Sequence, residues 1–410
     1  MIAKKQIDIL AYIYQLRILS HNQIYQIFFM KYNTDGTYGG SEYCNKYLRN
    51  MIQSGYIAKI KYNGEKYYYI LTKGIHVLQS QSVPWLGEGN GNIETYRQSA
   101  KVRVLEKNIL HQASLNQFVL NFISKKYPVA WNYLDESYMD ISAMKTFKPD
   151  GILIVEDSIY FLEMDMGTET RKQLVDKWMR YRKCFSKKML QSYGKVTILF
   201  IQKDGTDTLF RKNMIISSIQ EIIPDLVNGE LLEILIGSQA QLQQYLERIT
   251  ESLFLEKTSD MLSVLKSQNY TISMIKNSLP LLYTPYYCRK RGEKGVITRN
   301  GIPEEFLLDE NICERQSILY NIATYKNAMI EFAKKNKRTI RYVIVEKEEG
   351  GSSQALYKEA EENPLILFTT KERLISHSGS ERFYKFIQGC KYHYDDQYSV
   401  LIIEDRSDKT

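Results

Sequence analysis

The sequence has no long apolar run and no secretory signal. Nowhere do its 410 residues approach 18 consecutive apolar positions, and its beginning carries Lys4, Lys5 and Asp8. A membrane-spanning helix needs about 20 apolar residues, and a signal peptide needs an apolar core. We therefore expect a soluble, cytoplasmic protein with no membrane partner.

Cysteine and histidine are scarce and scattered. The five cysteines, Cys44, Cys184, Cys288, Cys313 and Cys390, form no CxxC pair, and the five histidines are equally dispersed. This spacing indicates neither a disulfide framework nor a zinc site, so the thiols are expected to stay reduced. The sequence also lacks GxxxxGK[ST], HExxH and GxSxG, which disfavours an ATPase, a zincin or a serine hydrolase.

What is present is an ordinary globular composition with an uneven charge. Hydrophobic residues make up 44% and charged residues 25% of the chain, and its length suits two to four domains. Residues 1–85 contain ten Lys or Arg and four Asp or Glu, a net charge of +6 out of +8. Such a concentration of positive charge favours a polyanionic partner, and we expect double-stranded DNA.

The first 80 residues have the pattern of a winged helix. Apolar spacing predicts one helix around Ile7 to Tyr14, a second capped by Ser20, and a third that Ser41 caps and Gly55 ends. Asn63-Gly64 between two apolar runs predicts a β-hairpin, and a short helix to about residue 79 follows. In a winged helix the third helix enters the major groove and the hairpin contacts the DNA backbone.

The third helix and the wing carry residues suited to DNA. The exposed face of the helix is expected to present types that contact base edges and phosphates: Tyr43, Asn45, Lys46, Arg49 and Asn50. Phosphate contacts are expected from the wing, through Lys59, Lys61 and Lys66. The alternative is a protein-binding winged helix or a solvated charged face.

Residues 81–98 are rich in glycine and lack apolar periodicity, which predicts a linker. A helical pattern then covers residues 99–124. Within it, Glu106 is a candidate acid and His111 a weaker candidate, because a lone histidine on an apolar helix is more often a hydrogen-bonded core residue.

Residues 148–181 hold the densest group of candidate catalytic side chains. Two β-rich runs, 151–155 and 158–164, flank Glu156-Asp157 and predict a hairpin. A two-residue turn places Asp150 opposite Glu163 and puts Asp150, Glu163 and Asp165 on one face. The other face carries Leu153, Val155, Tyr160, Leu162 and Met164. A register shift of one residue would separate Asp150 from Glu163.

Buried carboxylates that lie close together need a cation or hydrogen-bond donors. Mg²⁺ would satisfy them, because carboxylate oxygens are its preferred protein ligands. Asp150 and Glu163 would then bind the metal. The alternative is that Asp150 caps a strand while Glu163 and Asp165 lie at a solvated rim.

A helix opened by Thr168 and Glu169 is expected next, with Leu174, Trp178, Tyr181 and Phe185 as its packed stripe. Lys177 beside this stripe is a candidate phosphate-binding cation. More often such a lysine extends into water.

The rest of the chain alternates between strands and helices. We expect strands at 196–202 and 231–236 around a helix at 213–223, which completes a mixed sheet flanked by helices over residues 99–248. Residues 249–410 are expected to form an α/β domain or extension, with helices at 253–276 and 315–335 and strands at 342–346, 365–369 and 400–403. A basic loop carries Arg289, Lys290, Arg291, Lys294 and Arg299 beside Tyr286 and Tyr287, and it could either grip DNA or be a solvated loop.

Several of these motifs, taken together, carry a family resemblance. Pro149-Asp150, the hairpin and Glu163-Met164-Asp165 resemble the PD-(D/E)xK nuclease-like fold, that is, a restriction-endonuclease-like sheet. The stretches PDG, EMDMGTET, LRNMIQSGYIAKI and YYYILTKG, with Lys177 and Tyr181, resemble the replication-relaxation family of plasmid and mobile-element proteins. The resemblance covers residues 1–235. Asp165 stands where these nucleases have a lysine, a departure that puts cleavage in doubt.

The resemblance implies a multi-domain α/β protein of a plasmid, phage or integrative element, acting in replication, relaxation or mobilisation. It would bind DNA, could form a homo-oligomer, and would assist a replication initiator or a relaxase, with a nuclease-like domain that does not cut. One alternative is a Mg²⁺-dependent endonuclease or nickase using Asp150, Glu163, Asp165 and Lys177. The other is a winged-helix transcriptional regulator.

Overall fold

The computed structural model describes two compact units of mixed α/β structure, which confirms the predicted fold class. The first unit comprises residues 1–168, 196–206 and 238–250, and the second comprises 169–195, 207–237 and 251–410. The described residues are 2–32, 38–81, 98–125, 129–136, 148–156, 158–185, 196–206, 208–227, 232–254, 265–267, 270–274, 286–290, 305–311, 313–336, 340–376, 382–387, 390–394 and 401–403. Most of the predicted linker, residues 82–97, lies outside them.

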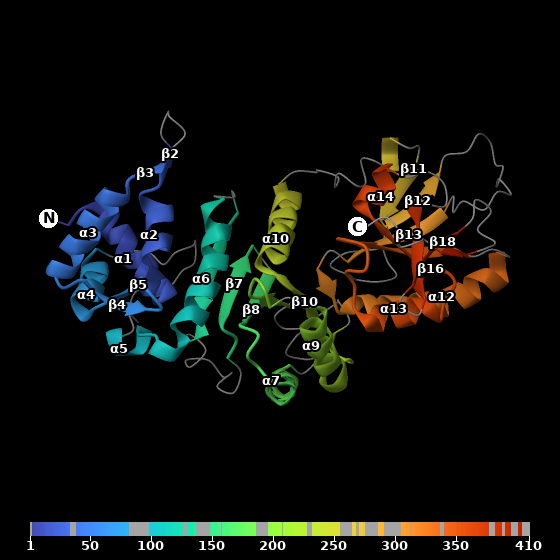
Figure 1. The fold of residues 1–410 in the computed structure, drawn as a ribbon, viewed down its shortest axis with the longest axis horizontal. Helices are drawn as coiled ribbons and strands as arrows, with labels where there is room; N and C mark the ends of the chain where they lie inside the picture. The colour runs from blue at the N-terminus through green and yellow to red at the C-terminus, as the bar shows by residue number, and fades with distance from the viewer. Residues whose placement is uncertain are drawn as a thin grey trace. The chain divides into compact units, whose positions relative to one another are not determined.

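The N-terminal part of the first unit contains the predicted three helices and hairpin (Figure 1, blue). Its helices are α1 (Lys4–Leu16), α2 (His21–Phe28), α3 (Ser41–Gln53) and α4 (Thr72–Ser80). Its strands are β1 (Leu19–Ser20), β2 (Lys31–Tyr32), β3 (Tyr38–Gly39), β4 (Ile57–Tyr62) and β5 (Glu65–Ile70). Strand β5 lies between β1 and β4 in an antiparallel sheet, so the hairpin is joined to the segment between the first two helices.

Local sequence explains where these elements begin and end. The Ser20 side chain accepts a hydrogen bond from the Gln23 N–H and caps α2, as predicted. The predicted cap of α3 is wrong by one position: Gly40, in the left-handed region, precedes the helix, and Ser41 is its first residue. Asn63 and Gly64 both have positive φ, at 47° and 83°, the pairing that a two-residue hairpin turn of type I′ requires.

The remainder of the first unit is a sheet with helices beside it (Figure 1, cyan to green). Its strands are β6 (Trp131–Asp135), β7 (Gly151–Val155), β8 (Ser158–Asp165) and β9 (Val196–Gln202), in spatial order β9-β8-β7-β6. Strands β6, β7 and β8 are antiparallel, whereas β8 and β9 are parallel. The strands are apolar and largely buried, as expected for a sheet covered on both faces.

The single helix predicted for residues 99–124 is broken in the structure. It consists of α5 (Ser99–Val102), a 3₁₀ turn at Glu106–Asn108 and α6 (Ile109–Ser124). Arg103 has extended backbone angles, and this interrupts the helix where the apolar pattern alone gave no sign of a break. Helix α10 (Gln239–Phe254) also contributes to this unit, through residues 239–250.

Buried polar side chains join the N-terminal helices to α6 and β6. Asn116 of α6 is fully buried and donates hydrogen bonds to the carbonyls of Leu16 and Ile18. Gln15 donates to the carbonyl of Tyr133 at 2.6 Å, and Arg17 donates to that of Val102 at 3.1 Å. We call Gln15, Arg17 and Asn116 the polar clamp. These contacts make residues 1–81 part of one packed body with the sheet.

Strain at Arg17 agrees with this tight connection. Arg17 has a φ of 69°, a conformation that non-glycine residues adopt only when their surroundings compensate. Its guanidinium also pairs with Glu136 at 2.6 Å. A small apolar cluster of Ile18, Tyr67, Val104 and Ile109 packs across the same junction.

The second unit is built around an eight-stranded sheet of order β11-β12-β13-β15-β16-β17-β18-β19. Its strands are β11 (Tyr270–Met274), β12 (Tyr286–Lys290), β13 (Glu305–Asn311), β15 (Arg341–Glu346), β16 (Ile366–Thr370), β17 (Tyr384–Ile387), β18 (Cys390–Tyr394) and β19 (Leu401–Ile403). Only β13, β15 and β16 run parallel to one another. Helices α12 (Ser317–Asn336) and α13 (Gln354–Glu361) supply apolar residues to one buried cluster, and α14 (Lys371–Ser376) supplies Leu374 to another.

The other elements of this unit are α7 (Arg171–Cys184), α9 (Leu209–Ile222), β10 (Leu232–Ser238) and β14 (Glu314–Arg315). The predicted stripe of α7 is buried, and its Trp178 donates a hydrogen bond to Ser218 of α9 at 2.9 Å. The helix begins two residues later than predicted, because Thr170, not Thr168, provides the cap. Strand β14 pairs with β10, and Arg315 forms a buried ion pair with Asp309 at 3.1 Å.

Two predictions for the C-terminal region are wrong. Residues 270–274, expected within a helix, form β11 and pair with β12. Their Tyr-Thr-Ile-Ser-Met sequence alternates large and small residues and suits a pleated strand. Arg289 and Lys290, expected in a loop, belong to β12, while Arg291, Lys294 and Arg299 lie outside the described residues. Within the described residues, no helix is both long enough and apolar enough to cross a membrane.

Candidate nucleic-acid interface and carboxylate site

Helix α3 presents the polar face that the sequence predicted. Cys44, Leu48 and Met51 are buried beneath the helix and fix its rotation. The five predicted residues are all exposed on its outer side: Tyr43, Asn45, Lys46, Arg49 and Asn50. Because one side of the helix is anchored in the core, this side is free to meet a partner surface.

Aromatic packing fixes the N-terminal end of this face. The ring of Tyr43 lies 5.1 Å from that of Tyr47 and 6.3 Å from that of Phe29, centroid to centroid. The Asn45 side-chain oxygen accepts a hydrogen bond from His21 Nε2 at 3.1 Å, and its amide nitrogen donates one to the Ser41 carbonyl. These contacts limit the rotamers available to the two side chains, which reduces the entropy that binding would cost.

The hairpin β4–β5 carries three exposed lysines. Lys59, Lys61 and Lys66 are all exposed, and Lys61 and Lys66 are directly paired across the two strands. Like charges directly opposite each other on a hairpin repel, so this arrangement costs free energy in the isolated protein. An anionic partner would remove that repulsion.

The hairpin β7–β8 has the predicted register. Gly151 pairs with Leu162 and Val155 with Ser158, so the same register places Asp150 opposite Glu163. Glu163 and Asp165 are 2% and 0% exposed, whereas the Asp150 side chain is 23% exposed. The acidic face is therefore buried at β8 and reaches solvent at Asp150. The alternative that Glu163 and Asp165 lie at a solvated rim is therefore wrong.

His111 of α6 contacts Asp150. Its Nε2 atom lies 3.2 Å from Asp150 Oδ2 and 3.1 Å from the carbonyl oxygen of Met164. The Met164 N–H donates to the same Asp150 oxygen at 2.8 Å. Because an ionised carboxylate and a carbonyl only accept hydrogen bonds, Nε2 must carry a proton. His111 thus positions Asp150 against β8.

Asp165 ends its strand in a tight turn. Its Oδ1 accepts a hydrogen bond from the N–H of Gly167 at 2.9 Å, and its carbonyl accepts one from Lys203 after β9. Gly167 has a φ of 76°, and a Cβ there would lie 2.9 Å from Thr206. The loops after β8 and β9 therefore pack closely at this end of the sheet.

Oxygen donors of this kind suit a hard divalent cation, and Asp150, Glu163 and Asp165 are the residues that would hold one. Among the described residues, however, no three His, Cys, Asp or Glu side chains form a group that could hold a metal ion. The carboxylates match Mg²⁺ in chemistry, but a complete site would need a further donor from another residue type.

Lys177 forms an ion pair with Glu169, with Nζ 3.0 Å from Oε1. Arg211 of α9 also approaches Glu169, and it donates to the Glu169 carbonyl. Only 12% of the Lys177 side chain is exposed, so it does not simply extend into water. Glu106 is exposed in the 3₁₀ turn before α6.

Sequence reasoning missed one polar residue at the end of β9. Gln202 is fully buried and is paired in register with Asp165 on β8. The signal was present: the apolar run VTILFIQ ends in an amide at the carboxyl end of a parallel strand, where functional groups often gather.

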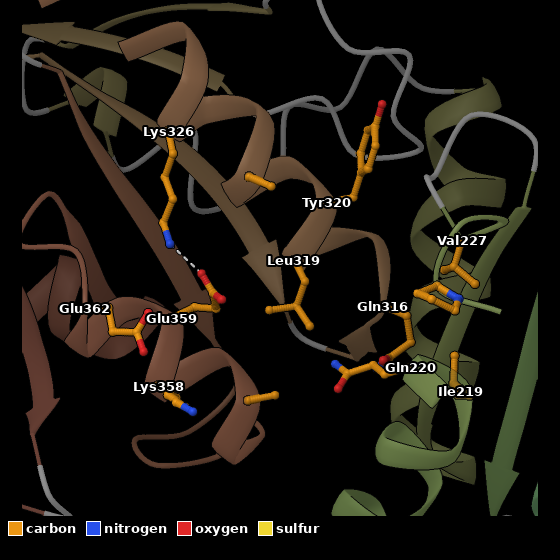
Figure 2. A pocket seen from close by; sticks show the side chains of 13 residues that line it. Ile219, Gln220, Val227, Gln316, Leu319, Tyr320, Lys326, Lys358, Glu359 and Glu362 are labelled. Carbon is orange, nitrogen blue, oxygen red and sulfur yellow. Dashed lines mark hydrogen bonds and ion pairs between the residues drawn. The ribbon is translucent and has the colours of Figure 1, made fainter. Parts of the chain in front are cut away.

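A hollow of about 730 Å³ lies in the second unit among α9, α12 and α13. Leu319 and Tyr320 of α12 are among the residues that line it, and Figure 2 shows Lys326 of α12 joined to Glu359 of α13. Their charged atoms are 2.5 Å apart, so these two groups neutralise each other. Because residues of three helices line it, the hollow is an interhelical groove.

Residues 10–199 match the model of the replication-relaxation family, which confirms over that range the resemblance seen in the sequence. This stretch includes most of the α1–α4 segment, the carboxylate hairpin and most of β9. No curated protein matches the chain.

Proposed function

Because residues 10–199 match the replication-relaxation family model, we propose that the protein is a DNA-binding accessory factor of a plasmid or other mobile element, acting in replication or relaxation. Residues 1–81 would bind double-stranded DNA as a winged helix, with α3 in the major groove and the β4–β5 hairpin on the backbone. The matching family model supports the biological role. An initiator or a relaxase would be the protein partner.

One observation carries the DNA-binding proposal. The outer face of α3 and the hairpin lysines are exposed together on the segment that holds most of the net positive charge. Amide and guanidinium groups on α3 suit base edges, and Lys59, Lys61 and Lys66 suit phosphates. The partly repulsive Lys61–Lys66 pair adds a reason for an anionic partner.

The test is fluorescence anisotropy with duplex DNA from the protein's own element, at several salt concentrations. Replacing Lys59, Lys61 and Lys66 by glutamine should weaken binding and reduce the salt slope by about 0.9 for each phosphate that a lysine no longer neutralises. Arg49→Gln should weaken binding more on the preferred sequence than on random DNA.

A matched control replaces three exposed lysines elsewhere, Lys172, Lys183 and Lys266, by glutamine. It makes the same change in net charge and should leave the affinity nearly unchanged. An equal decrease in affinity in both triple variants would show that binding follows total charge, and would overturn the assigned surface.

The second candidate is a metal-dependent nuclease, favoured by the buried acids of β8 beside Asp150. In that mechanism Asp150 and Glu163 bind Mg²⁺, and Asp165 is a further ligand or base. Supercoiled DNA incubated with Mg²⁺ or Mn²⁺ would be nicked by the wild type. Cleavage that persists in Glu163→Gln or in EDTA would exclude this site as its source.

A further inference from the structure

Gln202 is a buried amide with no hydrogen-bond partner in the described part of the chain. Its exposed fraction is 0%, and neither Oε1 nor Nε2 has a partner among the residues that the structure describes. Asn116, another fully buried amide of the same unit, donates to two backbone carbonyls and accepts from Gln112. Most buried polar groups in proteins are paired, so an exception calls for a specific explanation.

The position of Gln202 links it to the acidic face. Strands β8 and β9 are parallel, and Asp165 is the register partner of Gln202. Register partners on neighbouring strands have side chains on the same face of a sheet, and Glu163 lies on that face two residues before Asp165. The orphaned amide therefore belongs to the same surface as the buried carboxylates.

Leaving this amide unpaired is costly, and an apolar side chain would fill the position without that cost. Its neighbours Phe200 and Ile201 are fully buried and apolar, so strand formation alone does not require glutamine here. A group that binds at the acidic face and accepts the amide oxygen as a ligand would account for the residue.

We propose that Gln202 is a metal-binding residue, whose amide oxygen joins the carboxylates of Glu163 and Asp165 in holding a hard divalent cation such as Mg²⁺ or Mn²⁺. Amide oxygens are suitable ligands for such cations. Among the described residues, no three His, Cys, Asp or Glu side chains form a metal-binding group by themselves, and the Gln202 amide would supply the additional donor. The amide nitrogen would donate to a carboxylate or to a water of the hydration shell. The proposal is independent of DNA binding by α3 and requires no cleavage.

The test compares the melting temperature of the full chain with and without Mn²⁺ for wild type, Gln202→Met and Gln202→Glu. Mn²⁺ should raise the melting temperature of the wild type, because a ligand that binds only the folded state stabilises it. Without metal, Gln202→Met should melt at or above the wild-type temperature, since it removes an unpaired amide. It should need about 10- to 100-fold more Mn²⁺ for the same shift.

Gln202→Glu keeps an oxygen donor and adds a charge, so it should melt lower without metal and show an equal or larger Mn²⁺ shift. This variant also decides the matter if the methionine protein does not fold. A wild type without any Mn²⁺ shift, or a Gln202→Met protein with an unchanged shift, would overturn the proposal. So would a lower metal-free melting temperature for Gln202→Met, because the amide would then be paired with a buried water. Anisotropy with DNA, measured without metal, reports separately on the α3 surface.

Discussion

Asn116 shows how much a single buried side chain can hold together. It is fully buried in α6 and donates to the carbonyls of Leu16 and Ile18, two residues from a different part of the chain. Asn116→Ala should lower the free energy of unfolding by about 2–4 kcal/mol, because both carbonyls would be left without this buried donor. Urea unfolding followed by circular dichroism measures this.

The control is Asn121→Ala on the same helix. Asn121 is only partly buried and accepts a hydrogen bond from Gln117, so its replacement should cost about 1 kcal/mol or less. Comparable destabilisation in the two variants would mean that the Asn116 bonds contribute no more than an ordinary helix position.

Glu346 provides a prediction about pH. It is buried in the second unit and accepts hydrogen bonds from the hydroxyls of Tyr357 and Tyr384, both at 2.5 Å. Burial raises its pKa above the ordinary value of 4.5, and hydrogen bonds from Ser352, Tyr357 and Tyr384 offset part of that rise. The folded protein therefore binds this proton more strongly than the unfolded chain does.

The stability linked to Glu346 is thus fully present below about pH 4.5 and decreases as the pH rises towards the folded pKa. Glu346→Gln should make the decline in melting temperature above about pH 4.5 shallower. Glu348→Gln, at an exposed position two residues away, should leave the decline unchanged. An identical profile for wild type and Glu346→Gln would contradict the assignment.

At this scale the sequence located the acids but not their partners. The two-residue turn fixed the register, and with it the face shared by Asp150, Glu163 and Asp165. The contact between His111 and Asp150 joins residues 39 positions apart, and the isolation of Gln202 depends on what surrounds it in space. Neither feature can be predicted from the local periodicity of the sequence.

At the scale of elements, strongly patterned segments were predicted well. The strand at 196–202 matches β9 residue for residue, and the hairpin at Asn63-Gly64 is present because few other dipeptides accept two positive φ angles. Strand β11 was mistaken for a helix, since its identity depends on pairing with β12, which lies 12 or more residues further along the chain. The break before α6 was missed because only extended backbone angles at Arg103 reveal it.

Gly40 gives a prediction at the start of α3. It has a φ of 101°, and a Cβ there would lie 2.2 Å from the carbonyl oxygen of Phe29. Gly40→Ala should cost about 2–4 kcal/mol of stability through strain and this clash, and should weaken DNA binding by displacing α3. Thermal unfolding and anisotropy measure the two effects.

Gly64 in the wing turn is the matched control. Its φ is 83°, but a Cβ there would meet no atom within 4 Å. Gly64→Ala should therefore cost only the backbone strain, about 1 kcal/mol. If the two variants were equally stable, contact with Phe29 would not be what selects glycine at the start of α3.

For the whole molecule, the polar clamp predicts that residues 1–81 remain attached to the sheet without a covalent link. Gln15, Arg17 and Asn116 contribute buried hydrogen bonds across this junction, and Ile18, Tyr67, Val104 and Ile109 contribute a shared apolar cluster. A specific protease site placed within residues 82–97 should yield two fragments on a denaturing gel that elute together in size-exclusion chromatography.

Adding Gln15→Ala and Asn116→Ala to the cleavable protein should allow the fragments to separate. Fragments that separate with the polar clamp intact would show that residues 82–97 supply the connection instead. The sequence alone does not predict this non-covalent attachment, because a glycine-rich stretch indicates a linker whether or not the segments on either side of it pack together.

The polar clamp has a consequence for the position on DNA at which a reaction at the acidic face would occur. If α3 occupies a major groove, the hairpin β7–β8 is carried at a constant distance and angle from it, since both belong to one packed body. Any nick made by the acidic face would then fall a constant number of base pairs from the recognition sequence, always on the same strand. Lengthening the stretch at residues 82–97 would not move it.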